Sequence, residues 1–413
     1  MFVNHLSLTN FRNYGRLELQ LPPGPTLLHG NNAQGKTNLL EALYYLATSR
    51  SPFADNDHQL LNWDASQSGE LITVGRLVCQ ISTESGRRTV EMRLIQEQKQ
   101  SLSNGGLSFR REVLVNQRKV RVMDLLGNLR VVLFLPEDVQ LITGSPSSRR
   151  RYMDITLCQI DNIYCRTLSQ YNKVVEQRNA LLRQIAEGQS SVDLLPVFTD
   201  KVIKLGSQIF ARRARFLAEI ARTAQQIHYE SLTEGKETIR LRYLPRLVMT
   251  ENGRSPDDHA LTQAGEWLQT HSQNIATIEA RFEETLSHAQ HKDIARGSTS
   301  VGPHRDDWHF VLNGRSLSSF GSRGQQRSAI LALKLAEIQW MTAQTGESPV
   351  LLLDEVVAEL DAHRRALLLN TVLQATQSIL TATDPAMFTS DFLHKATSMT
   401  VQNGRVQLDP VFE

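Results

Sequence analysis

The chain has 413 residues, enough for two or three lobes and a sizeable hydrophobic core. Its formal net charge of +2 excludes a uniformly basic protein, so a polyanion would have to bind a local patch or a groove between two copies. The sequence has no apolar run long enough for a membrane span, no leader-like start and no metal-binding spacing among its three cysteines, so we expect a cytoplasmic protein with reduced thiols and no membrane contact.

Residues 1–145 are predicted to form a β-rich region around one helix. The segment Phe2–Thr9 alternates apolar and polar side chains, which is typical of a half-buried strand, and residues 113–122 have the pattern of a hairpin. Pro25–His29 is a short apolar run that predicts a buried strand, and residues 38–47 predict a helix with apolar side chains on more than one face.

Between that strand and that helix lies the most specific motif of the chain, which fits G-x-x-x-x-G-K-[ST]. Its glycines permit close backbone approach, and its N–H groups together with the helix N-terminus form an anion site. Lys36 would reach the β- and γ-phosphates of a nucleotide, and the Thr37 hydroxyl would ligate Mg²⁺. The nucleotide-contacting positions are Gly30, Asn31, Asn32, Ala33, Gln34, Gly35, Lys36 and Thr37.

Residues 146–295 are predicted to be helical, with the clearest periodicity over 164–187 and 205–229. Basic side chains gather in this region. They either contact DNA phosphates, independently of base sequence, or line a solvated helix face, and both interpretations stay open. The first candidates are Arg149, Arg150, Arg151, Arg212 and Arg213, followed by Lys201, Lys204, Arg215 and Arg222.

Residues 296–413 return to strands. An Asn-Gly turn within 311–315 predicts a tight hairpin, and residues 378–382 and 399–402 predict two further strands. The block Gly302–Asp307 contains His-Arg-Asp, as protein kinases do, but the other kinase motifs are missing from the chain, so we assign this block no chemistry.

The segment Phe320-Gly-Ser-Arg-Gly-Gln-Gln326 stands just before a predicted helix. It resembles the L-S-G-G-Q signature of ATP-binding-cassette (ABC) ATPases at three positions, Ser322, Gly324 and Gln325. A helix N-terminus is a natural anion site. Alone, the same residues could merely begin a capped helix, so the signature depends on the other motifs.

An apolar run over 349–353 predicts a buried parallel strand that ends in Asp354 and Glu355. Asp354 would hold Mg²⁺ through water, and Glu355 would orient or deprotonate the attacking water. Without the upstream glycine loop, a helix N-cap pair would be an equal explanation. Asp361 lies six residues after Glu355, as in the D-loop of ABC ATPases.

The order of these motifs resembles that of ABC ATPases, in which the signature contacts the γ-phosphate of ATP held by a second copy. The interval from Thr37 to Ser322 is far longer than in transporter ATPase subunits, and it lacks the sustained heptads of SMC proteins. Several blocks resemble the RecF family of bacterial recombination mediators, from end to end of the chain. They are N-F-R-N-Y at 10–14, T-N-L-L-E at 37–41, L-P-E-D at 135–138, G-S-P at 144–146, R-R-R at 149–151 and V-G-P-H-R-D-D at 301–307.

The resemblance implies an α/β fold: an ABC-type P-loop ATPase head, with a mixed sheet and an antiparallel β subdomain, and an inserted helical lobe. We expect the head to span 1–145 and 296–413, and the lobe 146–295. The resemblance also implies binding of ATP and Mg²⁺, slow hydrolysis, an ATP-dependent homodimer and binding of double-stranded and gapped DNA. It implies action with RecR and RecO in loading RecA during recombinational repair, replication restart and the SOS response.

Each composite ATP site would combine Lys36, Thr37, Asp354 and Glu355 of one copy with Ser322 and Gly324 of the other. By the same resemblance, Arg12 would contact the α- or β-phosphate, although an ion pair explains it equally well.

Two features of ABC ATPases have no clear match. The switch histidine is replaced by Thr383-Asp384, and Gln140 is the nearest candidate for a Q-loop glutamine. Two alternatives remain, namely an ABC transporter ATPase subunit and a DNA scaffold that does not hydrolyse ATP.

Overall fold

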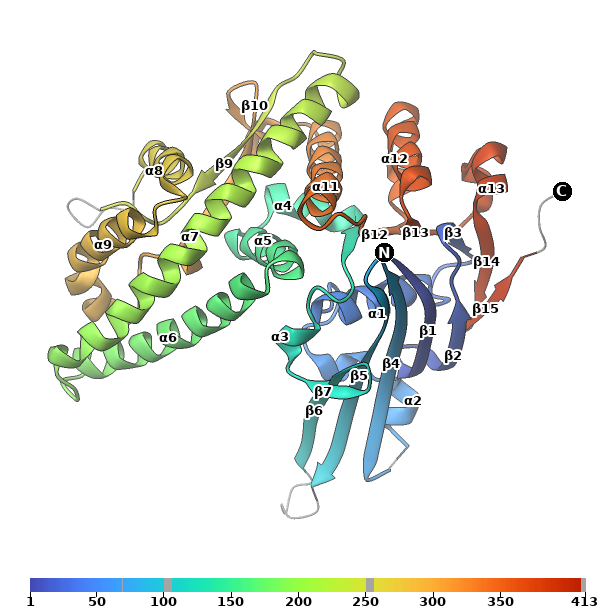
Figure 1. The fold of residues 1–413 in the computed structure, drawn as a ribbon, viewed down its shortest axis with the longest axis horizontal. Helices are drawn as coiled ribbons and strands as arrows, with labels where there is room; N and C mark the ends of the chain where they lie inside the picture. The colour runs from blue at the N-terminus through green and yellow to red at the C-terminus, as the bar shows by residue number, and fades with distance from the viewer. Residues whose placement is uncertain (69, 100–105, 250–255, 410–413) are drawn as a thin grey trace. The chain divides into compact units, whose positions relative to one another are not determined.

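The computed structural model describes residues 1–68, 70–99, 106–249 and 256–409, which fall into two compact units (Figure 1). The first unit is Met1–Glu137 with Glu337–Glu413, and the second is Asp138–Ala336. The expected head included everything from residue 296. Residues 296–336 group with the second unit instead, because β10 (Asp307–Leu312) pairs with β9 (Ile239–Leu244) along its whole length.

The first unit is built on a mixed sheet to which both halves of the chain contribute. Its order is β15-β14-β3-β13-β12-β8. Each adjacent pair of strands is parallel except the β14–β15 pair, which is antiparallel. Every residue of β8, β12 and β13 is buried, and β8 and β12 are mainly apolar runs, as expected of strands in a parallel sheet. The strands are β3 (Gly24–His29), β8 (Val131–Phe134), β12 (Val350–Asp354), β13 (Gln377–Ala382), β14 (Thr397–Gln402) and β15 (Arg405–Leu408).

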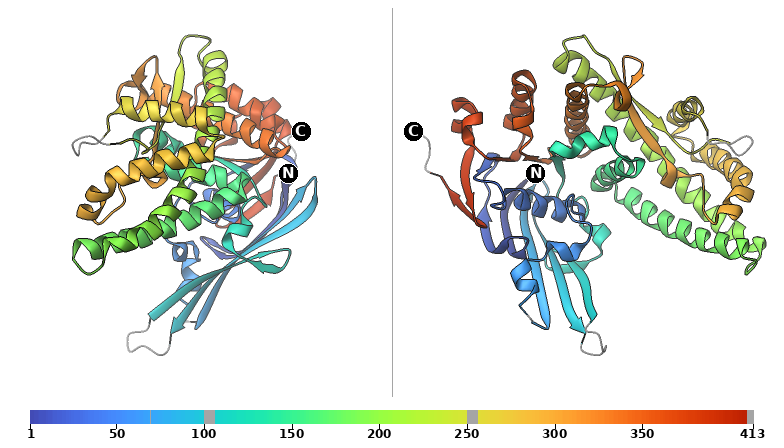
Figure 2. Two further views of the ribbon diagram at one scale, coloured as in Figure 1. Left: turned by 60° about the vertical axis from the view of Figure 1, so that its left-hand side comes forward. Right: turned by 180° about the vertical axis from the view of Figure 1, so that it is seen from behind.

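The second sheet of this unit is antiparallel, in the order β2-β1-β4-β5-β6-β7 (Figure 2). Its strands are β1 (Phe2–Phe11), β2 (Tyr14–Gln20), β4 (Ile72–Thr83), β5 (Gly86–Lys99), β6 (Gly106–Val115) and β7 (Arg118–Val120). Alternate side chains such as Leu77, Cys79 and Ile81 are buried in one core with α1 (Lys36–Thr48), whereas Arg76 and Gln80 on the other face of β4 are exposed. The predicted mixed sheet, antiparallel subdomain and α/β class are therefore confirmed.

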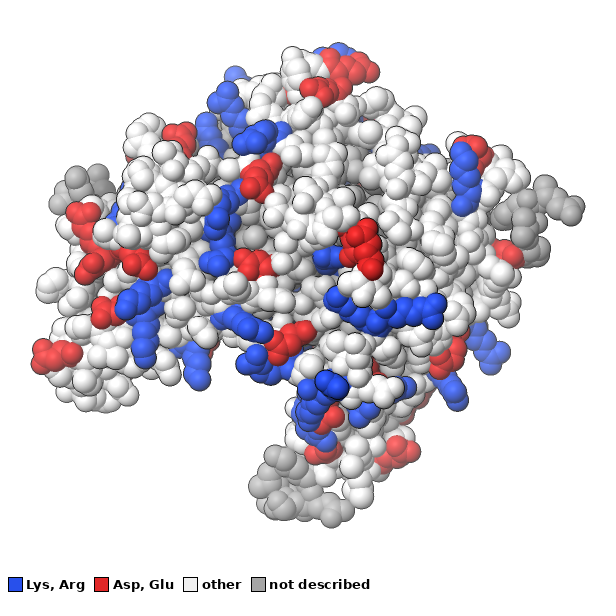
Figure 3. Space-filling view, viewed as in Figure 1, with Lys and Arg blue, Asp and Glu red and all other residues white. Residues whose placement is uncertain are grey.

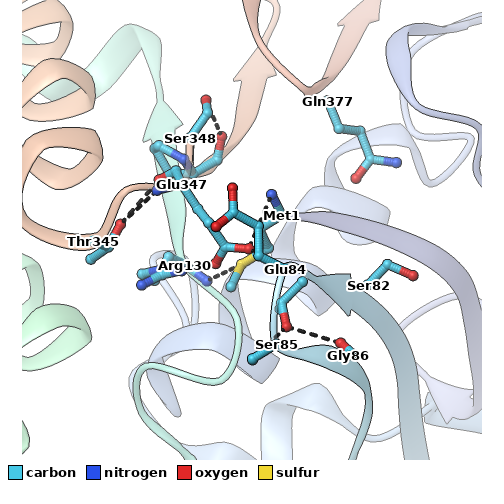
Figure 4. A network of polar contacts seen from close by, with 12 residues as sticks. Met1, Ser82, Glu84, Ser85, Gly86, Arg130, Thr345, Glu347, Ser348 and Gln377 are labelled. Carbon is cyan, nitrogen blue, oxygen red and sulfur yellow. Dashed lines mark hydrogen bonds and ion pairs between the residues drawn. The ribbon is translucent and has the colours of Figure 1, made fainter.

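A polar network joins three distant segments of the first unit (Figure 4). Glu347 lies before β12 and accepts hydrogen bonds from Arg130 at 2.5 Å and from the backbone N–H of Glu84 at 2.7 Å. Arg130 is half-buried, and burial lowers its pKa below the usual arginine value while Glu347 opposes that effect. Gln377 similarly pairs its side-chain amide with both backbone groups of Val3. These contacts hold the two halves of the chain together.

The second unit is mainly helical. The long helices α6 (Asn162–Ala186) and α7 (Leu195–Gln226) lie side by side and run in opposite directions (Figure 1). Both predicted periodic segments, 164–187 and 205–229, fall largely on them, and α7 continues into a π-helical turn at Ile227–Leu232. The other helices are α4 (Gln140–Thr143), α5 (Pro146–Ile160), α8 (Asp258–His271), α9 (Ile275–Arg296) and α10 (Leu317–Phe320), and α11 (Arg323–Thr345) crosses the boundary between the units.

The smaller predicted elements are also present. The Asn313-Gly314 turn joins β10 to β11 (Arg315–Ser316), with both turn residues at positive φ. The 113–122 hairpin corresponds to the β6–β7 pair. The remaining helices, α2 (Trp63–Ser66), α3 (Val122–Leu125), α12 (Ala362–Gln374) and α13 (Ser390–Lys395), belong to the first unit. Among the described residues, every helix is too short or too polar to span a bilayer.

The block Gly302–Asp307 lies in the polar core of the second unit. Asp306 is buried and accepts hydrogen bonds from the Tyr243 hydroxyl and from Arg213 at 3.2 Å, and burial raises its pKa to about 6 although both donors favour the ionised form. His304 contacts the Tyr171 hydroxyl at 2.8 Å, and burial lowers the pKa of His304 to about 4. These contacts tie the block to α6, α7 and β9, which gives it a structural role.

Candidate nucleotide-binding site

The glycine loop lies between β3 and α1, as predicted, and its backbone requires glycine at two positions. Gly30 and Gly35 have φ values of 141° and 114°. A Cβ at Gly30 would lie 2.4 Å from the carbonyl oxygen of Val401, and a Cβ at Gly35 would lie 2.6 Å from the side-chain nitrogen of Asn13. The chain therefore approaches this loop closely from two sides.

Two turns from opposite ends of the chain hold Gln34 at the middle of this loop. The Gln34 carbonyl accepts hydrogen bonds from the Asn13 side chain at 2.9 Å and from the Gly404 N–H at 3.1 Å. The Gln34 side chain accepts the N–H of Asn403 at 2.8 Å, and the Tyr14 hydroxyl donates to the Gly35 carbonyl at 3.0 Å. Sequence analysis missed this support, although Asn13 and Tyr14 belong to the N-F-R-N-Y block and Asn403-Gly404 is a turn signal.

A cavity of about 390 Å³ opens beside the loop. Its lining includes residues 32–38 of the loop and helix, together with Asp354 at the end of β12 and Glu355 just after it. Lys36 donates hydrogen bonds to the carbonyls of Gly30 at 2.7 Å and Asn31 at 3.0 Å, and it lies 3.4 Å from a Glu355 oxygen. The other lining residues are Phe53, Pro136 and Glu137.

The acidic end of the cavity is organised around Asp354, which is buried. Its Oδ1 accepts hydrogen bonds from Thr37 at 3.0 Å and from Thr381 at 2.6 Å. Burial raises the pKa of Asp354 above its usual value, while the two threonine hydroxyls favour the ionised form and Glu355 opposes it. Thr381 was not predicted. Its signal is a polar residue directly after the apolar pair Ile379-Leu380 of β13, at the position that pairs with Asp354.

Glu355 follows Asp354 in a left-handed conformation, with φ of 51° and a side chain that is 39% exposed. Its backbone N–H donates to the Thr381 hydroxyl at 3.0 Å, so the turn that presents the carboxylate is fixed by β13. The side chain itself is left facing the cavity beside Lys36. A carboxylate placed in this way is suited to accept a proton from a bound water.

The oxygen donors of Thr37 and Asp354 fit Mg²⁺, which prefers hard oxygen ligands. Within the described residues, His, Cys, Asp and Glu form no group of three that could hold a metal ion. A magnesium ion at this site would therefore take most of its ligands from water and from the phosphates of a nucleotide, as is usual for Mg²⁺ in ATPases.

Arg12 forms the ion pair that sequence analysis left open. Its guanidinium donates to both carboxylate oxygens of Glu41, at 2.7 and 2.6 Å, and to the carbonyl of Gln59 at 2.9 Å. Glu41 is buried in α1 and also accepts a hydrogen bond from Ser51. In this arrangement Arg12 fixes α1 to the β1–β2 turn, and it could reach a phosphate only by leaving Glu41.

The signature segment lies in the second unit, at the start of α11. Ser322 and Gln325 cap the helix reciprocally. Gln325 Oε1 accepts the Ser322 N–H at 2.8 Å, and Ser322 Oγ accepts the Gln325 N–H at 3.3 Å. A second cavity, of about 350 Å³, adjoins this helix start and is lined by residues that include Gln325, Arg315 and Phe320, and Phe320 is 73% exposed. Ser322 and Gly324 are exposed.

Asp361 is the N-cap of α12. Its carboxylate accepts the N–H of Arg364 at 3.0 Å, and this hydrogen bond lowers the pKa of Asp361 below its usual value. The side chain also pairs with the Arg364 guanidinium. The position predicted as a D-loop aspartate thus has a local structural role in a single copy.

Two of the predicted DNA-contacting arginines are buried, which corrects that part of the interpretation. Arg149 forms a two-pronged pair with Asp307, at 2.6 and 2.8 Å. Arg213 is only 1% exposed and pairs with Asp154 at 2.8 Å and Asp306 at 3.2 Å. Neither guanidinium can face a phosphate, because each already neutralises carboxylates inside the protein.

The other three predicted arginines remain at or near the surface. Arg150 is partly buried and donates to the Asp306 carbonyl at 2.6 Å. Arg212 is partly buried and pairs with Asp161 at 2.8 Å, whereas Arg151 is exposed. The run 149–151 is therefore divided between the interior and the solvent.

Known proteins resemble the chain over nearly its whole length. A family described as the RecF/RecN/SMC N terminal domain matches residues 2–407. The DNA replication and repair protein RecF of Roseiflexus castenholzii is 38% identical over 411 residues, which is 98% of this chain and 99% of that protein. The protein of the same name from Geobacillus thermodenitrificans is 33% identical over 407 residues, with the same coverage.

Solved structures lead to the same family. A structure of the recombination mediator protein RecF with ATP, in the RecFOR pathway, has a TM-score of 0.79 and 29% identity, and covers 99% of this chain and 98% of its own. The Smc head domain from Pyrococcus furiosus has a TM-score of 0.50 at 14% identity and covers 99% of this chain and 96% of its own, a likeness of fold alone. The resemblance based on the sequence motifs is thus confirmed, and this chain belongs to the RecF family of DNA replication and repair proteins.

Proposed function

We propose that this chain is a cytoplasmic ATP-binding protein of DNA repair and replication that binds ATP with Mg²⁺ in the 390 Å³ cavity. The observation that carries the proposal is the convergence of Lys36, Thr37, Asp354 and Glu355 on that cavity. Lys36 would bind the β- and γ-phosphates, the loop N–H groups would bind the remaining charge, and Thr37 and Asp354 would hold the metal ion. Bound ATP–Mg²⁺ supplies an electrophilic γ-phosphorus, and Glu355 would orient and deprotonate the attacking water.

We further propose that two copies close around two ATP molecules, each contacted by the signature of the other copy. The exposed Ser322 and Gly324 at the start of α11 support this, because the first turn of a helix has backbone N–H groups without intrahelical acceptors, which can bind an anion. Gln325, in the same turn, and Asp361, at the start of α12, would also contribute to binding of the nucleotide. Membership of the RecF family removes the transporter alternative, whereas the non-hydrolysing scaffold remains the competing function.

The oligomeric mass in solution with Mg²⁺ tests the two-copy site. We expect ATP to convert the wild-type protein from monomer to dimer, and expect Lys36→Ala and Ser322→Arg to stay monomeric. The first change removes a phosphate contact within one copy, and the second places a bulky cation at the surface that meets the other copy. Light scattering with and without ATP measures the mass. A wild-type protein that binds ATP and stays monomeric would contradict the two-copy site.

DNA binding is proposed for the outer face of α7 in place of the buried arginines. Five basic residues of α7 are spaced by 3, 8, 3 and 7 residues, which places them along one stripe of the helix. They are Lys201, Lys204, Arg212, Arg215 and Arg222. All five side chains are exposed or partly exposed. Figure 3 shows basic side chains along the course of α7, interrupted by acidic ones. Arg213 does not belong to this stripe, because successive residues of a helix point about 100° apart, and its side chain is buried.

Charge reversal on this stripe should weaken DNA binding without affecting folding. For the double variant Arg215→Glu with Arg222→Glu, we expect lower affinity for duplex DNA and a log–log salt slope shallower by about 0.9 for each lost phosphate contact. Fluorescence anisotropy across a salt titration measures both. The matched control reverses the exposed Arg87 and Arg118 of the first unit. An unchanged slope in the α7 variant would remove this face from the proposal.

The relatives support a proposal about the partners of this chain. Because solved relatives are described as recombination mediators in the RecFOR pathway, we propose that this chain acts with RecR and RecO and helps load RecA on gapped DNA. Thr383-Asp384 in place of a switch histidine supports slow hydrolysis, which suits a switch between two assembly states. Binding of RecR to the ATP-bound dimer, measured by light scattering, would test the first of these contacts.

A further inference from the structure

We infer that Glu237 is a positioning residue of the signature, acting through Gln325 on Ser322. The inference rests on the proposed function, in which Ser322 contacts ATP held by a second copy. The observation that carries it is a hydrogen bond from Gln325 Nε2 to Glu237 Oε1 at 2.7 Å. Glu237 is far from the signature in sequence, and neither the motif nor its spacing predicts this contact.

The contact fixes which way the Gln325 side chain faces. An amide has a donating and an accepting end, and here the donating end is held by the Glu237 carboxylate. The accepting end is thereby directed at the Ser322 N–H, 2.8 Å away. Ser322 Oγ in turn accepts the backbone N–H of Gln325, so the side chains of Gln325 and Ser322 hold each other in place.

Glu237 is itself held in place by the π-helical turn that ends α7. Thr233 Oγ1 accepts the Glu237 N–H at 3.3 Å, and the Glu237 carbonyl receives a second contact from Thr233 and one from His228. The next residue, Thr238, donates its N–H to Asn313, in the turn that precedes Arg315. π-Helical turns are frequent at functional sites. Here the chain that follows the turn brings the Glu237 carboxylate to Gln325.

Substitutions at Glu237 test this role through ATP-driven dimerisation. We expect Glu237→Ala to weaken dimerisation roughly tenfold or more, because a charge-assisted hydrogen bond is lost at both signatures of the dimer. Its affinity for ATP as a monomer should be unchanged, since the loop, Asp354 and Glu355 are untouched. Glu237→Gln keeps an oxygen that can accept from Gln325, so it should restore most of the dimerisation. Sedimentation at several ATP concentrations measures these values.

The control is Glu230→Ala, which removes a carboxylate from the π-helical turn itself, where it accepts a hydrogen bond from Gln226 at 3.2 Å. We expect this variant to dimerise like the wild type. If Glu237→Ala also does so, or if Glu237→Gln fails as badly as alanine, the positioning role is overturned. Thermal unfolding of all variants separates a local effect from general destabilisation.

Hydrogen exchange provides a readout that requires no ATP. In Glu237→Ala the Ser322 amide should exchange several-fold faster than in the wild type, because its acceptor is no longer held, whereas Glu230→Ala should not change it. Unchanged exchange would overturn the inference. If the wild type fails to dimerise with ATP, the proposed function is lost, and exchange alone still decides whether Glu237 positions the signature.

Discussion

Replacing Arg213 with alanine should lower the free energy of unfolding of the second unit by about 3–5 kcal/mol. Arg213 is buried and bridges Asp154 and Asp306, and it also contacts the Tyr164 hydroxyl at 3.0 Å and the Pro303 carbonyl at 2.6 Å. Removal of the cation leaves Asp306 buried with fewer compensating partners. A buried carboxylate in that state is costly, because it must either stay charged without a counterion or take up a proton.

Arg212 provides a matched control at the neighbouring position. It lies on the outer stripe of α7 and makes one ion pair, with Asp161, at the edge of solvent. We expect Arg212→Ala to cost less than about 1 kcal/mol. Chemical denaturation followed by circular dichroism compares the two variants, because α7 contributes much of the helix signal. Equal midpoints for Arg213→Ala and the wild type would mean that this polar core does not hold the unit together.

Replacing Glu355 with glutamine should trap ATP and stabilise the dimer. The glutamine retains the shape and hydrogen-bonding capacity of the side chain but cannot take a proton from water, so hydrolysis should fall by a factor on the order of 10² or more. The variant also removes the negative partner that lies 3.4 Å from Lys36, which leaves the lysine free for phosphate oxygens. Binding therefore persists while the chemical step is blocked.

Single-turnover hydrolysis and light scattering with ATP measure the two effects of Glu355→Gln. The control is Glu359→Gln, which changes the same charge in the turn that follows β12 but does not line the cavity described above. If Glu355→Gln hydrolyses ATP at the wild-type rate and its dimer is no more stable, Glu355 does not activate water. The non-hydrolysing DNA scaffold would then become the better account of the ATP site.

The parts of the site that were predictable from the sequence are local. Short runs of sequence specify the strand, glycine loop and helix around Lys36, and also the strand that leads to Asp354 and Glu355. In each run the residue types directly indicate whether the segment is buried, turned or helical. Thr381 could not be found in this way. Its importance depends on the parallel register that places it opposite Asp354, and a register of two strands far apart in sequence is a property of the folded sheet.

The basic residues show a different limit. Arg212 and Arg213 are adjacent in sequence, and both were assigned to one DNA-contacting set on the basis of charge. Successive residues of a helix point about 100° apart, so helical periodicity could have separated the exposed stripe from the buried arginine. Periodicity alone would not have shown that Asp154 and Asp306 neutralise Arg213, since those partners come from α5 and from the segment before β10.

The clamping of Gln34 by the turns at Asn13 and at Asn403–Gly404 has a thermodynamic consequence. A flexible anion-binding loop must lose conformational entropy when its ligand arrives, and that loss is subtracted from the affinity. Here contacts within the protein already hold Gln34 in place, so in the proposed function the phosphates would meet a partly ordered loop. The free energy that an ordering transition would otherwise have consumed would then contribute to the closing of a second copy over the same nucleotide.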